Sequence, residues 1–326
     1  MDSIDGIARR VTLRELRLLL AVARSGSILK ASQDIGLTQP AVSKSIADLE
    51  GTMGVRLFDR TNRGVEPTAQ GHVVLRRAAG VFQELRQAVD ELDFLADSGG
   101  GEVRIGGTPG MCAGLLSHAV CSIAAERPRM RYNVVELESE KLGREILSRS
   151  IDAGIGREPI IGDDNVGFER LFEDRLFIVA GTQHPLAGRQ SIRLEEAAAE
   201  RWVLPMPGTP ITQQLQSAFR RLGAALPHAT VTTMSMLIRY ELLATSRFVT
   251  VMYGSVLKFG NAPRCLRVLP VDLSAGIPIG LARLRNRTLT PAMELFLERV
   301  RKLAQPMRSL NAQQLRRTLR HKRRVG

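Results

Sequence analysis

The sequence predicts an amino-terminal helical domain, one long helix, and a carboxy-terminal α/β domain built from two subdomains. Residues 27–50 are typical of two short helices joined by a sharp turn, because Gly36 suits a left-handed helix end and Pro40 fits a first helical turn. Residues 68–96 form a helical pattern without proline. From residue 102 onward, apolar strands alternate with helices, as in a parallel or mixed sheet covered by helices.

The second of the short helices has two different faces. Val42, Ile46 and Leu49 share one face at helical spacing, which indicates a core. The opposite face is small and polar, and its residues are Gln39, Pro40, Ser43, Lys44 and Ala47. Such a face suits the DNA major groove, where Gln39 can read adenine, Ser43 can reach either base type, and Lys44 can contact phosphate or guanine. Spacing alone leaves a helical hairpin with a solvated polar face as an equal alternative.

The flanking sequence decides between these alternatives. The stretch from Val11 to Gly71 contains TQPAVSKSI, the LE…LF…R run from Leu49 to Arg60, and PTAQG at its end. It closely resembles the winged helix-turn-helix domain of the LysR-type transcriptional regulators. Members usually carry two alanines where this sequence has Ala31 and Ser32, and serine is nearly as small. The resemblance implies a DNA-binding domain over residues 1–67.

A wing is expected between Leu57 and Thr68. A glycine-containing turn lets the backbone approach a duplex closely, so Arg60 and Arg63 are placed to hold phosphates or to enter the minor groove. A solvated loop is the alternative. For Arg60, a structural ion pair with Asp59 or Asp48 is a second one.

The long helix carries a heptad pattern. Its apolar residues follow one another at intervals of three and four: Leu75, Ala78, Phe82, Leu85, Val89, Leu92 and Ala96. A seam of this kind needs a partner helix, so residues 68–97 are predicted to form a coiled-coil dimerisation linker about 45 Å long. A homodimer would set two recognition helices against the half-sites of a dyad DNA site.

Residues 98–101, Ser-Gly-Gly-Gly, are interpreted as a hinge, since consecutive glycines are costly inside a regular element. Residues 102–304 follow the strand and helix order of the LysR-type effector domain, which resembles periplasmic-binding proteins of type II. We expect subdomain I at 102–175 and 275–304, and subdomain II at 176–274. The basic stretch 305–326 is expected to be a disordered tail.

Ligands of such folds bind between the subdomains, beyond the carboxyl ends of strands. The candidate effector-binding residues that follow predicted strands are Thr108, Gly110, Arg157, Gly208, Thr209, Ser235 and Tyr253. Free N–H groups and hydroxyls there would receive a carboxylate or a sugar hydroxyl. Taken singly, each hydroxyl residue is explained better by helix capping, and Arg157 equally well by a surface charge. The prediction rests on the convergence of these residues on one cleft.

The charge of the chain supports a nucleic-acid partner only in part. The net charge is +13, but the last 26 residues hold nine Lys or Arg and no acid. Residues 9–64 hold ten bases against five acids, which favours phosphate contact modestly. No apolar run approaches the roughly 20 residues that span a bilayer, and the amino terminus lacks a hydrophobic signal. We therefore expect a cytoplasmic, nucleoid-associated protein without membrane contact.

The three cysteines, Cys112, Cys121 and Cys265, show no metal-ligand spacing. Cys112 and Cys121 are predicted on opposite faces of one helix, which excludes a redox pair. The five histidines are dispersed, and neither a phosphate-binding loop nor a nucleophile elbow is present. No cofactor and no metal are therefore predicted.

The resemblance implies a transcriptional regulator. Two alternatives are a two-domain α/β enzyme and a constitutive architectural DNA-binding protein. The resemblance also implies a homodimer, paired into a homotetramer through its sensor domains, that contacts RNA polymerase at a promoter. Its inducer would be a small molecule, such as an acidic catabolic metabolite or a sugar derivative, that binds two cleft conformations unequally.

Overall fold

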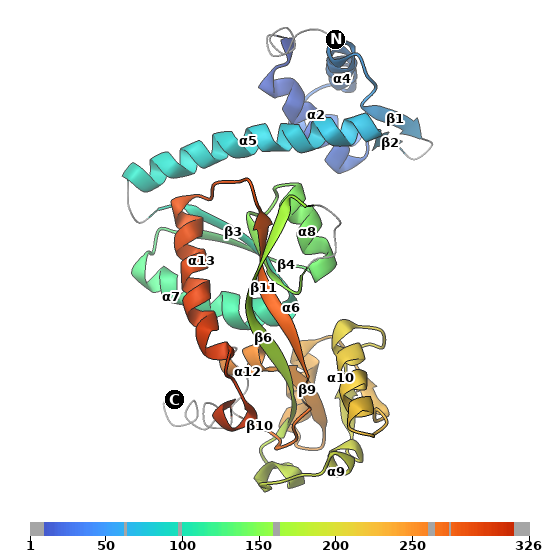
Figure 1. Ribbon diagram of the computed structural model, residues 1–326. Helices are drawn as coiled ribbons and strands as arrows, with labels where there is room; N and C mark the ends of the chain where they lie inside the picture. The colour runs from blue at the N-terminus through green and yellow to red at the C-terminus, as the bar shows by residue number, and fades with distance from the viewer. Residues whose placement is uncertain are drawn as a thin grey trace. The chain divides into compact units, whose positions relative to one another are not determined.

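The computed structural model describes residues 10–61, 64–96, 100–158, 164–259, 265–273 and 275–315. The chain divides into two compact units. One contains the amino-terminal part of the chain up to Leu92, and the other contains most of the chain from Asp93 onward. The first unit is helical with a small hairpin, and the second is an α/β structure (Figure 1). The predicted fold class is confirmed.

The amino-terminal unit begins with α2 (Leu13–Ser25), α3 (Ile28–Ile35) and α4 (Gln39–Met53). Thr12 starts α2 through reciprocal hydrogen bonds, since its hydroxyl accepts from the Glu15 N–H and the Glu15 carboxylate accepts from the Thr12 N–H. Gly26 and Gly36 end α2 and α3 in the left-handed conformation, at φ 64° and 71°. The predicted turn between α3 and α4 is thus confirmed.

The wing is a two-stranded antiparallel hairpin of β1 (Phe58–Thr61) and β2 (Gly64–Pro67), within the range expected for it. The Val65 N–H donates to the Gly26 carbonyl at 2.9 Å, which ties the hairpin to the end of α2. Gly64, at φ 139°, lies so close to the same carbonyl that a Cβ would collide with it. Asn62 and Arg63 lie outside the described residues.

Helix α5 (Ala69–Ala96) confirms the predicted long helix. Thr68 precedes it, and its hydroxyl accepts from the Gly71 N–H at 2.9 Å. A side chain at Gly71 would strike the Leu57 carbonyl, so glycine is what lets α5 start directly beside the wing. Leu75 and Ala78 of α5 pack into the core of the amino-terminal unit.

The α/β unit is built from the following elements: β3 (Glu102–Gly107), α6 (Pro109–Met111), the π-helix η1 (Cys112–Leu116), α7 (Ser117–Glu126), β4 (Arg131–Glu136), α8 (Ser139–Leu147), β5 (Ala153–Gly156), β6 (Val166–Gly181), the short helix η2 (Pro185–Gly188), α9 (Leu194–Ala198), β7 (Trp202–Leu204), α10 (Pro210–Arg221), β8 (Ala229–Thr232), α11 (Met236–Ala244), β9 (Val249–Tyr253), α12 (Gly254–Phe259), β10 (Leu266–Val268), β11 (Gly276–Leu284), α13 (Pro291–Ala304) and the short helix η3 (Gln305–Met307).

Strands follow the order β4-β3-β5-β11-β6-β9-β7-β8, with β10 paired to β6. Strand β3 is parallel to β4 and β5 in one lobe, and β7 is parallel to β8 and β9 in the other. Strand β6 belongs to both lobes, because its first part pairs with β11 and its second part with β9 (Figure 1). The two lobes correspond to the two expected subdomains.

Apolar side chains fill both faces of the sheet. The largest core joins β3, α7 and α13 of the first lobe to Val179, Leu243 and Leu257 of the second lobe. Helix α8 closes the other face of the first lobe with Leu142 and Ile146. Helices α9 and α10 pack on the second lobe around Trp202 and Phe219, whose rings meet edge to face at 6.0 Å.

The expectation of disorder over 305–326 is wrong for residues 305–315. Met307, Leu310 and Leu315 are 1%, 6% and 0% exposed and belong to the largest core. The composition of the whole stretch is dominated by the basic residues beyond Leu315, which concealed three apolar residues that pack against the fold. Residues 316–326 lie outside the described residues.

The predicted hinge falls partly outside the described residues, since Ser98 and Gly99 are not described. Gly101 adopts φ 120°, and a Cβ there would come within 2.7 Å of the Ala292 Cβ of α13. Close packing against α13 therefore explains glycine at this position. The hinge itself stays a prediction.

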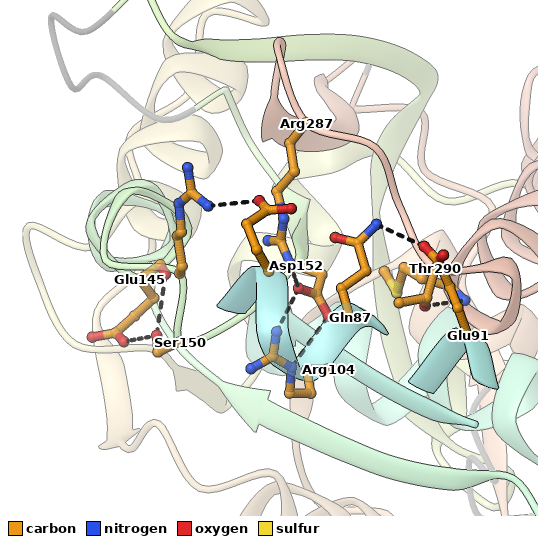
Figure 2. Close-up of polar contacts among 11 residues, drawn as sticks. Gln87, Glu91, Arg104, Glu145, Ser150, Asp152, Arg287 and Thr290 are labelled. Atoms are coloured by element: carbon orange, nitrogen blue, oxygen red, sulfur yellow. Dashed lines mark hydrogen bonds and ion pairs between the residues drawn. The ribbon is translucent and has the colours of Figure 1, made fainter. Parts of the chain in front are cut away.

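A buried ionic cluster ties the first lobe together. Asp152, which precedes β5, accepts hydrogen bonds from Arg104 of β3 at 2.7 and 3.2 Å and from Arg287, which follows β11 (Figure 2). All three side chains are nearly inaccessible to solvent. Two guanidinium groups that share one buried carboxylate depend on its charge.

We expect the substitution Asp152→Ala to lower the free energy of unfolding by about 3–5 kcal/mol, because it leaves buried guanidinium groups without their anion. Urea unfolding of the full-length protein measures this loss. Glu298→Gln is the control, because its ion pair with Lys302 is exposed and should contribute little. A loss no larger than that of the control would contradict the role given to Asp152.

Candidate functional site

Helix α4 presents the predicted DNA-reading residues to solvent. Gln39, Pro40 and Lys44 are exposed and Ser43 is half-buried. On the opposite face, the core residues Val42, Ile46 and Leu49 are 0%, 6% and 1% exposed. The division of α4 into an apolar inner face and a polar outer face is therefore confirmed. Contact of these residues with DNA stays a prediction.

Thr38 directly precedes α4, a position where threonine often caps a helix, but its side chain makes no capping hydrogen bond. Its backbone is extended, at φ −78° and ψ 147°, and Pro40 follows in the first turn. Because the Thr38 side chain accepts no hydrogen bond from the first turn of α4, it leaves the donors at this helix end to other acceptors. Such donors suit a phosphate as well as water.

The wing arginines are described incompletely. Arg60 lies in β1 opposite Val65, but its side chain is not among the described ones, and Arg63 lies outside the described residues altogether. Asp59, one of the two partners considered for Arg60, lies 3.8 Å from Arg56 in an exposed ion pair. The roles of Arg60 and Arg63 stay predictions.

Glu50 is a residue that sequence reasoning missed. Its carboxylate accepts from the N–H groups of Leu57 and Phe58 at 2.6 and 3.2 Å. The end of α4 thereby holds the start of the wing at a fixed place. The sequence shows only an acidic residue near a helix end. It does not show that the N–H groups of Leu57 and Phe58 need an acceptor there.

Helix α5 carries an exposed apolar stripe. Leu85, Val89 and Leu92, all in the predicted seam, are 48%, 55% and 65% exposed, and Val81 adds another exposed apolar side chain at 41%. Phe82 is half-buried. Leu75, assigned to dimerisation, instead packs partly into the core of its own unit. The start of the heptad pattern therefore packs inside its own unit, whereas the later part forms an exposed apolar stripe.

In the first lobe, three predicted or neighbouring polar residues lie together. Thr108 follows β3 and Arg157 follows β5, at the same edge of the sheet because these strands are parallel. The Arg157 N–H donates to the Ser139 hydroxyl at 3.2 Å, and a Cβ on Gly156 would lie 2.9 Å from the Thr108 methyl group and 3.1 Å from Ser139 Oγ. Arg157 also pairs with Glu140 at 2.9 Å.

Tyr253 of the second lobe meets this group. A Cβ on Gly110 would lie 4.0 Å from the Tyr253 ring. The Tyr253 hydroxyl donates to Gln214 of α10 at 3.0 Å. Burial raises the pKa of Tyr253, the charge of Asp174 raises it further, and the charge of Arg157 lowers it. The candidates Thr108, Gly110, Arg157 and Tyr253 thus converge on one region between the lobes.

Gly208, Thr209 and Ser235 do not join this group through any described contact. Gly208 adopts φ 79°, which explains glycine there by backbone conformation. The Thr209 hydroxyl bonds Met206 and Thr212 within its own loop, and Ser235 caps α11 by accepting from the Ile238 N–H. For these three residues the structure favours the local explanation.

Ser139, Glu140 and Gln214 were not predicted. Ser139 and Glu140 begin α8, after strand β4, and the rule that gave Thr108 would have given them too. Gln214 lies one turn inside α10, and its Nε2 atom is buried without a hydrogen-bond partner among the described residues. Nothing in its sequence context distinguishes it from its neighbour Gln213.

The described cysteines are free thiols. Cys112 begins the π-helix η1 and donates to the Gly107 carbonyl at 3.4 Å, and burial raises its pKa to about 12. Cys121, on α7, is exposed. A thiol held neutral in this way is a poor nucleophile.

A cavity of about 250 Å³ lies elsewhere, between β6, the residues before β11 and the carboxy-terminal segment 311–313. None of the candidate effector residues lines it. No group of His, Cys, Asp and Glu that could hold a metal ion occurs within the described ranges. None of the described helices combines the length and apolar character needed to cross a membrane.

Comparisons with known proteins agree with this architecture. Residues 13–72 match the family "Bacterial regulatory helix-turn-helix protein, lysR family", and residues 96–305 match "LysR substrate binding domain". Among similar proteins, the SDS degradation transcriptional activation protein of a Pseudomonas strain is 30% identical over 86% of this chain and 93% of its own. The regulator GbpR of Azospirillum brasilense is 26% identical over 90% of this chain and 86% of its own.

Solved structures show the same fold. Full-length OxyR from Pseudomonas aeruginosa superimposes with a TM-score of 0.62 at 21% identity, covering 89% of this chain and 95% of that one. Full-length CbnR in complex with its target DNA gives a TM-score of 0.61 at 18% identity, covering 90% and 99%. The two family matches together span nearly all of the described residues. The chain belongs to the LysR family, and it is a DNA-binding transcriptional regulator with an amino-terminal helix-turn-helix and a carboxy-terminal effector-binding domain.

Proposed function

We propose that two copies of this chain bind a dyad promoter site through α4, and that a small molecule in the cleft between the lobes switches the bound complex. Effector binding must favour one cleft conformation over another, since only differential affinity can shift such an equilibrium. The complex would act on transcription through DNA bending and contact with RNA polymerase.

The observation that carries this proposal is the outer face of α4. Its first turn and a half present Gln39, Pro40, Ser43 and Lys44 without an acidic side chain among them. Short polar groups allow the helix to enter a major groove about 12 Å wide, and Gln39 has the donor and acceptor that adenine requires. Arg60 and Arg63 are proposed to contact the backbone or the minor groove beside it.

We expect Gln39→Ala and Ser43→Ala each to weaken binding to a specific site by about 1–3 kcal/mol, while binding to random duplexes stays unchanged. The specific site is first selected in vitro with the wild-type protein, and fluorescence anisotropy at one salt concentration gives the affinities.

Gln216→Ala is the matched control, because it removes an exposed glutamine from α10 in the other unit. Equal losses on the selected and random duplexes would show that Gln39 and Ser43 do not read bases.

Dimerisation through α5 is supported by its exposed apolar stripe. Leu85, Val89 and Leu92 follow one another at intervals of one helical turn, and all three are exposed. An apolar stripe of this kind is unfavourable in water and is typical of a helix that pairs with another. A second copy of α5 can cover them, together with Phe82. Pairing of dimers into a tetramer through the α/β units is proposed on the family resemblance alone.

We expect Val89→Glu to convert the dimer largely to monomer, because it places a charge in the centre of the stripe. Sedimentation equilibrium at several protein concentrations measures the change. Val73→Glu is the control, since Val73 is also exposed on α5 but lies off the stripe. A dimer of unchanged strength in Val89→Glu would exclude this face.

The effector is proposed to be a small acid or a sugar derivative that contacts Thr108, Gly110, Arg157 and Tyr253. Hydroxyl, guanidinium and amide groups gather there, and the Thr108 hydroxyl makes no hydrogen bond within the described residues. Gly208, Thr209 and Ser235 stay in the proposal as residues of the second lobe that larger ligands would reach. We propose no cofactor for this protein.

A panel of small carboxylic acids and sugar acids, tested for stabilisation of the full-length protein, would identify the effector, since a ligand stabilises the state that it binds. We expect Thr108→Val to weaken the compound that stabilises most by about 2–10-fold through loss of one hydrogen bond. Ser217→Ala, an exposed hydroxyl on α10, is the control. An unchanged affinity in Thr108→Val would place the effector elsewhere.

Membership of a regulator family favours regulation over catalysis, and we infer that the chain is not an enzyme and works in the cytoplasm, where its DNA lies. A constitutive architectural protein would bind DNA in the same way with and without every compound of the panel. Dependence of the DNA footprint on one compound separates these possibilities.

A further inference from the structure

Asp174 lies in β6, where this strand passes from one lobe to the other, and its side chain is completely buried. Its carboxylate accepts from the Ser255 N–H at 3.0 Å, from the Ser255 hydroxyl at 2.5 Å, and from the Gly254 N–H. Among the described residues, no Lys or Arg forms an ion pair with it. The carboxylate therefore depends on uncharged donors alone.

These donors belong to the first turn of α12, which follows directly on Tyr253. Gly254, Ser255, Val256 and Leu257 are all buried, so this turn cannot move without repacking. Helix α12 also touches the first lobe, because the Ser255 carbonyl lies 3.0 Å from where a Cβ on Gly114 would be. Asp174 thus joins the crossing strand, α12 and the π-helix η1.

We propose that Asp174 is a positioning residue of the effector cleft, which holds Tyr253 in place through the first turn of α12 and releases this hold in response to pH. The inference deepens the proposed effector site and rests on it. The geometry supports it, since Tyr253 reaches Gln214 at one end of its side chain and is fixed to Gly254 at the other.

The chemistry follows from the number of acceptors. An ionised carboxylate can receive all three donors, whereas a protonated one carries a hydrogen on one oxygen and receives fewer. Burial raises the pKa of Asp174 to about 7 against the opposing effect of Ser255 and Gly254. Both forms are then present near neutral pH. Because folding raises this pKa, the contribution of Asp174 to stability is complete below its unfolded pKa of about 4, where the side chain is protonated. That contribution is lost as the pH rises through about 7 and the buried side chain ionises.

Other ionisable groups on the surrounding elements have to be separated from Asp174. Burial lowers the pKa of Lys258 on α12. It raises the pKa of Cys112 on η1 to about 12, so this thiol stays neutral near pH 7. Tyr253 stays neutral there because burial raises its pKa. Arg308 bonds the Leu171 carbonyl from the carboxy-terminal segment. His118 of α7 contacts Phe259 of α12, at 5.6 Å between ring centres, and a variant of its own separates it from Asp174.

Thermal unfolding of full-length wild type and Asp174→Asn across about pH 5 to 8 tests the titration. The variant has the shape of the aspartate but cannot ionise. We expect its melting temperature, relative to the wild type, to rise with pH up to about 7 and then to level off, because only the wild type must hold a buried charge once Asp174 is ionised. A difference that does not change with pH overturns the proposal.

Two controls make this result specific. Glu173→Gln changes the neighbouring carboxylate on β6, which is exposed and faces the opposite side of the strand, and should leave the pH profile as in the wild type. His118→Gln should also leave it unchanged. A profile that flattens in His118→Gln, with Asp174→Asn still titrating, assigns the pH response to the histidine and overturns the proposal.

The link to Tyr253 is read by ¹⁹F NMR of protein labelled with 3-fluorotyrosine. The chain has three tyrosines, so Tyr253→Phe assigns the signal, and Tyr132 and Tyr240 act as internal references. We expect the Tyr253 signal to shift with a midpoint near 7 in the wild type and not in Asp174→Asn. A Tyr253 signal that is insensitive to pH in the wild type, or equally sensitive in both proteins, overturns the proposal. Neither measurement uses an effector, so a failed search for an effector would count against the proposed function alone.

Discussion

The pairing of β6 with strands of both lobes is the constraint on which the α/β unit depends. One strand of 16 residues cannot bend freely between its two pairings, so β11 on one side and β9 on the other fix where the lobes stand. The shared apolar core that contains Val179 and Leu257 reinforces this placement. As a result, Thr108 and Arg157 of the first lobe come to face Tyr253 of the second, although more than ninety residues of sequence separate Arg157 from Tyr253.

The amino-terminal unit follows a different principle, in which backbone groups approach one another where a side chain would obstruct them. Gly64 lies against the carbonyl of Gly26, and Gly71 lies against that of Leu57. Glu50 receives two N–H groups at the start of the wing. These contacts bring the wing, the turn after α2 and the start of α5 into one rigid arrangement, with the outer face of α4 left open. The base readout proposed for Gln39 would depend on this rigidity, since a bidentate contact to a base edge needs a fixed geometry.

The sequence was informative where periodicity and local chemistry determine structure. The two faces of α4, the glycine turn at Gly36 and the length of α5 follow from such patterns. Prediction failed where long-range packing decides. The residues from Met307 to Leu315 look polar by composition, yet the core of the α/β unit recruits their few apolar side chains. The assignment of Thr209 and Ser235 to the effector site stays a prediction, although local hydrogen bonds already use their hydroxyls. Asp174 gave no signal, because it stands between Glu173 and Arg175 and looks like part of a charged surface.

A buried carboxylate without a cation is costly, and an apolar residue at the same position would remove the cost of desolvation. It would also leave the N–H groups of Gly254 and Ser255 buried without acceptors, at roughly 1–3 kcal/mol for each. The first turn of α12 lacks a capping residue of its own, because the preceding residue is Tyr253, whose side chain is bonded to Gln214 instead. Placing a tyrosine in the cleft therefore requires that the cap come from another element. Asp174 on the crossing strand provides it, and this arrangement makes the position of a cleft residue depend on the strand that also sets the position of the lobes.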